Sequence, residues 1–320
     1  MSKKPFIHVT RKLPDAVTKR LLASYDASLN DTDHVQSPEE LLKGAAKADA
    51  LLVTPTDKLT PELIEKLPAN IKMIATFSVG HEHINLEAAK KKGLPVSNTP
   101  DVLTDATADI ALLLMLGAAR RAYEGERAVR EATWKSWSTG YMLGVHMTGK
   151  RLGIFGMGRI GQAMAQRARG FNMQILYSNR SRLTPDLEAG ARYFADLKDM
   201  LPHCDVLAIH APATAATEKV INAETLALLP KGAVLVNTAR GSLIDEEALL
   251  AALKSGHLFA AGLDVFRSEP DFDLRFAELP NVFLTPHIGS ATVETRNAMG
   301  FRALDNVAAV CSGKDAIDPV

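Results

Sequence analysis

Four side chains of types that could reduce a ketone lie in the second half of the sequence: Arg240, Asp264, Glu269 and His287. Each ends or follows a predicted β-strand, and ligands of open parallel sheets bind outside the carboxyl ends of the strands. We therefore expect the four side chains to gather at one sheet edge. A histidine donates a proton near neutral pH, a neighbouring carboxylate favours its protonated form, and an arginine binds a carboxylate and polarises a ketone. The set suits reduction of a ketone next to a carboxylate, with His287 as the acid, Glu269 as its partner and Arg240 as the substrate anchor.

A glycine motif predicts where the hydride carrier for such a reduction would bind. Gly156-Met157-Gly158-Arg159-Ile160-Gly161 directly follows the apolar run 152–155 and opens a predicted helix. At such a turn the first glycine allows the tight bend, the second lets a pyrophosphate approach the backbone, and the third lets helix and strand pack closely. The helix N-terminus offers unpaired N–H groups to the phosphates. The whole motif, 156–161, is therefore predicted to bind a dinucleotide coenzyme.

The end of the next predicted strand indicates which coenzyme is preferred. An NAD site usually has Asp or Glu here to bond the ribose 2′-hydroxyl, but this sequence has Asn179, Arg180 and Arg182. Guanidinium groups bind a 2′-phosphate through charge-assisted hydrogen bonds. One such bond contributes roughly 1.5–3 kcal/mol, on the order of ten- to a hundredfold in affinity. We predict that NADPH is preferred, with NAD as the alternative coenzyme.

Short apolar runs alternate with helical patterns along the whole chain. Strands separated by helices imply parallel pairing with a crossover helix each time. We therefore predict an α/β protein with two doubly wound, Rossmann-like parallel sheets. The predicted helix 105–121 is apolar almost all round, which suits burial between domains or subunits, and the predicted helix 291–311 would return to the first domain. The predicted strands are 6–10, 50–53, 72–77, 151–155, 174–177, 205–210, 233–237, 260–265 and 282–285, and the other predicted helices are 15–24, 61–67 and 160–169.

The composition argues against several classes of protein. Lys plus Arg is 37 and Asp plus Glu is 37, whereas nucleic-acid binding needs a clustered basic surplus. The longest apolar run, 110–119, is too short to cross a bilayer, and no secretory signal is expected. The two cysteines, Cys204 and Cys311, fit a reducing cytoplasm and neither a disulfide framework nor a zinc site. We predict a cytoplasmic protein that binds no nucleic acid and no membrane.

Two further features suggest chemistry but have plainer interpretations. His81-Glu82-His83 would place two histidines on one face of a strand, but a third and a fourth metal ligand are not indicated nearby. We therefore predict no metal site and expect this segment to shape a pocket. Cys204 precedes a strand and is expected to be a small buried side chain.

In these motifs the sequence resembles the D-isomer-specific 2-hydroxyacid dehydrogenases over essentially its whole length. Besides the glycine motif and the Arg–Glu–His set, the resemblance rests on Ser78-Val79-Gly80 and on Thr99-Pro100-Asp101-Val102-Leu103-Thr104. It implies His287 as acid/base, Glu269 as its partner and Arg240 as substrate anchor, with Val79 and Gly80 offering N–H groups to the substrate carboxylate. It also implies a homodimer, a discontinuous substrate-binding domain of residues 1–99 and 290–320, and an NAD(P)-binding domain of residues 100–289. Further residues expected at the coenzyme are Thr104, Pro212, Thr217, Thr238, Ala239, Arg240, Asp264, His287 and Gly289.

Within this family, the sequence is most similar to the glyoxylate/hydroxypyruvate reductases. The similar features are Asn179-Arg180, the segment 99–105 and Trp134-x-x-Trp137. In related reductases the second tryptophan reaches the neighbouring subunit's active site, so Trp137 is expected either to bind substrate there or to be buried in the dimer interface. Phosphoglycerate dehydrogenases carry an extra regulatory domain after the position where this sequence ends, and formate dehydrogenases pair the histidine with Gln, so both are disfavoured.

The resulting hypothesis is an NADPH-dependent enzyme that reduces glyoxylate to glycolate and hydroxypyruvate to D-glycerate. One alternative is a dehydrogenase for another 2-ketoacid. An alternative from a different class is an NAD(P)-sensing interaction protein like the carboxyl-terminal-binding-protein corepressors, which share the fold and the same three residues. Those proteins carry additional disordered segments, and this sequence shows none.

Overall fold

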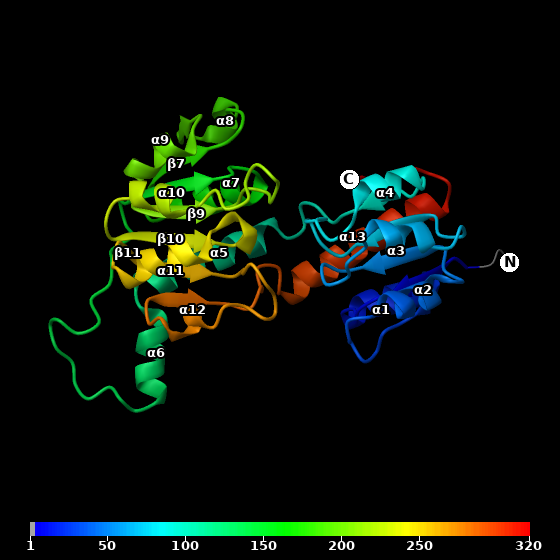
Figure 1. Cartoon of the computed structure of the whole chain (residues 1–320), viewed down its shortest axis with the longest axis horizontal. Helices are drawn as coiled ribbons and strands as arrows, with labels where there is room; N and C mark the ends of the chain where they lie inside the picture. Colours follow the sequence, from blue (N-terminus) through cyan, green and yellow to red (C-terminus); the bar gives the residue numbers. More distant parts are fainter. Residues whose placement is uncertain (1–3) are drawn as a thin grey trace. The chain divides into compact units, whose positions relative to one another are not determined.

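The computed structural model describes residues 4–320. They divide into two compact units, the first ending at Leu103 and resuming at Ala291–Val320, the second formed by Thr104–Ser290. Each unit is a parallel β-sheet with helices on its faces (Figure 1). None of the helices in the described part of the chain has the length and apolarity that a bilayer crossing requires.

The first unit has a five-stranded sheet in the order β2-β1-β3-β4-β5, and every neighbouring pair is parallel. Side chains from both faces of this sheet form apolar cores. The last helix of the chain, α13, packs on β4 and α1, far from it in sequence. The elements are β1 (Phe6–Val9), α1 (Asp15–Ser24), β2 (Asp26–Ser28), α2 (Pro38–Ala45), β3 (Ala50–Val53), α3 (Pro61–Lys66), β4 (Met73–Thr76), α4 (Leu86–Lys91), β5 (Val96–Ser97) and α13 (Val293–Cys311).

The second unit has a seven-stranded parallel sheet in the order β12-β11-β10-β9-β6-β7-β8. The order reverses between β6 and β9, which makes their carboxyl ends the switch point where such sheets bind ligands. The strands are β6 (Arg151–Phe155), β7 (Gln174–Ser178), β8 (Arg192–Phe194), β9 (Val206–Ile209), β10 (Ala233–Asn237), β11 (Leu258–Leu263) and β12 (Val282–Leu284). The helices are α5 (Thr104–Ala119), α6 (Ala122–Arg130), α7 (Arg159–Arg169), α8 (Pro185–Glu188), α9 (Leu197–Met200), α10 (Ala223–Leu228), α11 (Glu246–Lys254) and α12 (Arg275–Glu278), with short 3₁₀ turns η1 (Leu201–His203) and η2 (Gly241–Leu243).

The apolar helix α5 packs against α7, β10 and β11 of its own unit. It approaches the sheet so closely that a Cβ on Gly262 of β11 would lie 2.7 Å from the Leu114 carbonyl oxygen. The apolar side chains of α5 are therefore largely buried by packing within the second unit, although Leu113 is exposed.

The predicted fold class is confirmed, and every predicted strand has a counterpart in one of the two parallel sheets. Three strands were missed: β2, β5 and β8, which are two or three residues long and lie at sheet edges. Cys204 is fully buried as expected, and burial raises the pKa of its thiol to about 12.

Candidate active site

The glycine motif forms the turn between β6 and α7. Gly156 has a φ of +96°, and a Cβ there would lie 2.3 Å from the Ala211 nitrogen, so only glycine fits. A Cβ on Gly161 would lie 2.5 Å from the Gly156 carbonyl oxygen, which shows how closely α7 packs on the turn. A Cβ on Gly158, in contrast, would meet nothing within 4 Å. The turn therefore has open space at its middle glycine, beside the N-terminus of α7, where a pyrophosphate would approach the backbone.

The segment after β7 is fixed to this turn by Asn179. Its side-chain oxygen accepts a hydrogen bond of 2.6 Å from the Met157 N–H. Arg182 donates two hydrogen bonds, of 2.8 and 3.1 Å, to the Glu188 carboxylate, and these bonds hold the pKa of Glu188 below its ordinary value. Arg180 is exposed and makes no ion pair or hydrogen bond within residues 4–320. Of the two arginines predicted to bind a 2′-phosphate, Arg180 is thus the one without a competing carboxylate.

His287 and Glu269 form a close pair. His287 Nδ1 lies 2.6 Å from one Glu269 carboxylate oxygen, and the other oxygen accepts a 2.8 Å bond from the Phe266 N–H. Burial opposes ionisation of Glu269, but the His287 hydrogen bond and the nearby positive charges of His287 and Arg240 outweigh it and lower the pKa of the carboxyl group. The bond to Nδ1 leaves Nε2 as the ring nitrogen for proton transfer.

Arg240 lies at the carboxyl end of β10, where the buried Asn237 braces the turn. The Asn237 side chain accepts a 2.9 Å bond from the Ala239 N–H and donates one of 2.9 Å to the Arg240 carbonyl. A Cβ on the next residue, Gly241, would lie 1.9 Å from the Phe266 carbonyl carbon. This backbone contact brings the Arg240 turn against the loop that carries Glu269. Asn237 was not predicted, although a polar residue at the end of an apolar run was its signal in the sequence.

Asp264 holds the turn on which His287 lies. It is 1 % exposed and accepts hydrogen bonds from the Thr285 hydroxyl at 2.6 Å and from the Ile288 and Gly289 N–H groups at 2.8 Å each. Burial nevertheless raises the pKa of Asp264. Since both carboxylate oxygens are occupied in this way, the structure shows Asp264 positioning the turn 285–289.

Most of the other predicted coenzyme residues in the second unit lie on the loops that follow neighbouring strands. The Thr217 hydroxyl donates a 2.8 Å bond to the Pro212 carbonyl and so closes the loop after β9. The Thr238 hydroxyl lies 3.3 Å from Nδ1 of His210, a residue that was not predicted. Burial lowers the pKa of His210 to about 4, so this ring is neutral near pH 7. Thr104 is the exception, because it is the first residue of α5 and does not lie on a loop that follows a strand of this sheet.

Val79 and Gly80 belong to the first unit and follow β4. Their carbonyls are held in place, since Asn98 donates a 2.8 Å bond to the Val79 carbonyl and the Ser78 hydroxyl donates a 2.6 Å bond to the Gly80 carbonyl. Their N–H groups donate to no acceptor among residues 4–320. Two successive unpaired N–H groups suit the binding of a carboxylate. Nε2 of the neighbouring His83 forms a hydrogen bond of 2.9 Å with the Thr76 hydroxyl.

Trp137 lies in the loop after α6 and is 76 % exposed. Helix α6 has no buried residue, and Figure 1 shows it extending away from the sheet of the second unit, followed by a long irregular loop. Trp134, at 52 % exposed, and Leu143, at 64 %, belong to the same segment. The segment 122–144 therefore exposes several large apolar side chains.

The chain is similar to known proteins over nearly its whole length. A family model described as D-isomer specific 2-hydroxyacid dehydrogenase, NAD binding domain, matches residues 112–289. The chain is 42 % identical to glycerate dehydrogenase of Hyphomicrobium methylovorum, over 98 % of both chains. It is 41 % identical to glyoxylate reductase of Thermococcus litoralis, over 97 % of this chain and 95 % of the relative.

A solved structure is similar over the same length. The NADPH-dependent glyoxylate/hydroxypyruvate reductase of Sinorhizobium meliloti, in complex with NADP and malonate, superposes with a TM-score of 0.88 at 33 % identity, covering 99 % of this chain and 97 % of that one. The family model and the full-length relatives establish that the chain belongs to the D-isomer-specific 2-hydroxyacid dehydrogenase family.

Proposed function

We propose that this protein reduces glyoxylate and hydroxypyruvate with NADPH, giving glycolate and D-glycerate. The observation that carries the proposal is the 2.6 Å His287–Glu269 pair, which lies with Arg240 on the strand-end loops of the unit that also holds the glycine motif. Relatives named glyoxylate reductase and glycerate dehydrogenase, at 41 and 42 % identity, support the substrate class.

Each polar group has a role in this reaction. The bound coenzyme would supply the hydride. His287 donates the proton to the ketone oxygen through Nε2, and Glu269 orients the ring and stabilises its charged form. Arg240 binds the substrate carboxylate and polarises the ketone. That the N–H groups of Val79 and Gly80 also bind a substrate carboxylate stays a prediction.

The test is an assay of coenzyme oxidation with NADPH and NADH, offering glyoxylate, hydroxypyruvate and pyruvate in turn. Fast NADPH-dependent turnover of the first two is expected. Fast turnover of pyruvate alone would indicate a dehydrogenase for another 2-ketoacid. Tight NADPH binding without turnover of any ketoacid would favour the alternative of an NAD(P)-sensing interaction protein.

The preference for NADPH is assigned to Arg180. Replacing Arg180 with Gln is expected to raise the KM for NADPH roughly ten- to a hundredfold, because one charge-assisted bond to the 2′-phosphate is lost. The KM for NADH should hardly change. Arg182→Gln is the matched control. The Arg182 guanidinium is already hydrogen-bonded to the Glu188 carboxylate, so this replacement should change neither KM. Equal effects of Arg180→Gln on both coenzymes, or a wild-type preference for NADH, would overturn the assignment.

The exposed apolar segment 122–144 is proposed to pair with a second copy of the chain. Replacing Leu143, which is 64 % exposed, with Asp should convert a dimer to monomers, because the charge would be desolvated in the interface. Light scattering after size-exclusion chromatography measures the mass. Leu187→Asp, on a side chain 47 % exposed elsewhere in the second unit, should leave the dimer intact. A wild-type monomer, or a Leu143→Asp dimer, would contradict the proposal.

A further inference from the structure

A pocket of about 360 Å³ lies at the amino end of β7, on the edge of the sheet opposite the glycine motif. It exists because β8 begins opposite Leu176, two residues after β7 begins at Gln174, which leaves a notch beside the start of β7. Arg151, the first residue of β6, also lines it. From the rise of about 3.3 Å per residue, Arg151 in the pocket is roughly 17 Å along β6 from Gly156 in the coenzyme turn. Its volume is within the range of small-molecule sites.

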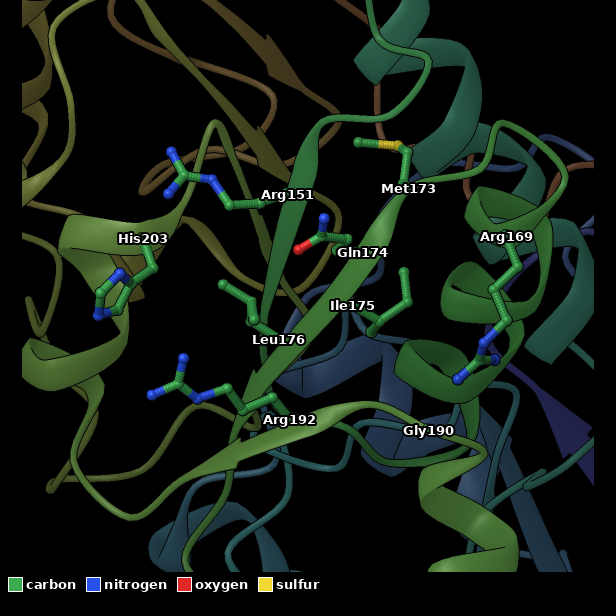
Figure 2. A pocket seen from close by; sticks show the side chains of 9 residues that line it. All are labelled: Arg151, Arg169, Met173, Gln174, Ile175, Leu176, Gly190, Arg192 and His203. Carbon is green, nitrogen blue, oxygen red and sulfur yellow. The ribbon is translucent and has the colours of Figure 1, made fainter.

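Cationic and polar side chains gather on one face of the sheet at this notch. The strand register pairs Arg151 with Gln174 and Leu176 with Arg192, and residues two apart on a strand share a face. Figure 2 shows Arg151, Arg192 and His203 on the same side of β7 as Leu176, whereas Arg169 lies on the other side. The buried Leu176 therefore forms an apolar floor between two guanidinium groups.

The pocket carries a surplus of positive charge. Three arginines line it, of which Arg169 lies on the other side of β7 and donates to the Glu188 carbonyl, and no acidic residue is among the lining residues. Arg151 is paired with Asp205 through bonds of 3.0 and 2.9 Å, which use its Nε and one terminal nitrogen and leave the other terminal nitrogen for a further acceptor. Arg192 lies 4.7 Å above the Phe194 ring and forms no ion pair within residues 4–320. The centroid of the Phe194 ring in turn lies 5.7 Å from the centroid of the His203 ring.

We propose that this pocket binds a small phosphate-bearing anion. The donors of Arg151, Gln174, Arg192 and His203 come from four separate elements, β6, β7, β8 and η1, which suits a tetrahedral phosphate better than a planar carboxylate held by one arginine fork. The apolar floor at Leu176 suits the carbon skeleton of a phosphate ester. Asp205 also accepts the Arg151 N–H at 2.9 Å, and its own backbone joins the starts of β6 and β10. A ligand on Arg151 would therefore stabilise the start of the sheet.

The test uses inorganic phosphate as probe and the full-length protein saturated with NADP⁺, so that the coenzyme turn is already filled. Phosphate should raise the Tm by a few degrees relative to sodium chloride of equal ionic strength, since a ligand that binds only the folded state stabilises it. Arg192→Gln should weaken phosphate binding, measured by calorimetry, at least tenfold. Its basal kcat with glyoxylate should be unchanged, which also shows that the variant is folded.

The matched control is Lys47→Gln, which removes one exposed positive charge in the first unit and should leave phosphate binding unchanged. Tungstate soaked into crystals should give an anomalous peak beside Arg192. Equal phosphate affinity in wild type and Arg192→Gln, an equal loss in Lys47→Gln, or equally tight binding of acetate would overturn the proposal. None of these results would alter the assay of ketoacid reduction, so this proposal and the proposed function fail separately.

Discussion

Replacing His287 with Gln is expected to lower the turnover of glyoxylate by about 10²–10⁴-fold, the usual contribution of a positioned general acid. The KM for NADPH should change little, because the glycine turn and Arg180 are untouched. His257→Gln is the matched control, since within residues 4–320 the His257 ring is hydrogen-bonded only to the Leu226 carbonyl, at 2.9 Å, away from the reacting groups. Steady-state kinetics of both variants give the comparison, and wild-type turnover in His287→Gln would remove this residue from the mechanism.

The pH profile separates a proton donor from a merely structural histidine. The pKa of Glu269 is lowered, so its carboxylate remains ionised at neutral pH and stabilises the protonated imidazole. In Glu269→Gln the protonated ring loses its ionic partner, and reduction needs the protonated form. The rate of reduction should therefore begin to fall at a lower pH in Glu269→Gln than in wild type. An unshifted profile would mean that Glu269 does not act through His287.

Removal of the Arg240 guanidinium is expected to have an effect of similar size. Arg240→Gln should lower kcat roughly 10²–10³-fold, the usual cost of losing one donor to the developing oxyanion, and should also raise the KM for glyoxylate because the substrate carboxylate loses its partner. Arg240→Lys keeps the charge but not the planar fork, so it should recover only part of the activity.

The matched control for Arg240 lies on a nearby loop. Arg267 is exposed and pairs with Glu218 at 2.8 Å, so Arg267→Gln should leave kcat and KM nearly unchanged. If Arg240→Gln changed only the KM for the coenzyme, the residue would be a coenzyme ligand and the substrate-anchor role would be wrong.

The interior strands were predictable because apolar residues dominate each of them. Parallel strands such as β3 (Ala50–Val53) and β9 (Val206–Ile209) are buried on both faces. A strand buried on both faces is apolar at nearly every position, and such an apolar run can be recognised in the sequence. The edge strand β12 (Val282–Leu284) is also an apolar run and was predicted, but the three missed edge strands carry no such signal. β2 (Asp26–Ser28) is half-exposed, and β5 (Val96–Ser97) has two residues, so no periodicity identifies either of them before its neighbouring strand is known.

The α/β class, the glycine turn and the candidate residues for reducing a ketone could be predicted from the order of the residues, because these depend on local patterns and on the rule that ligands bind at strand ends. Contacts between residues distant in the chain became visible only in the folded structure. These include the Glu188 partner of Arg182, the Asn237 brace under Arg240 and the bonds that occupy Asp264. The cationic notch likewise arises from the register of β8 on β7. The physical reason is that hydrogen bonding and burial depend on distances in space, which no spacing along one chain specifies.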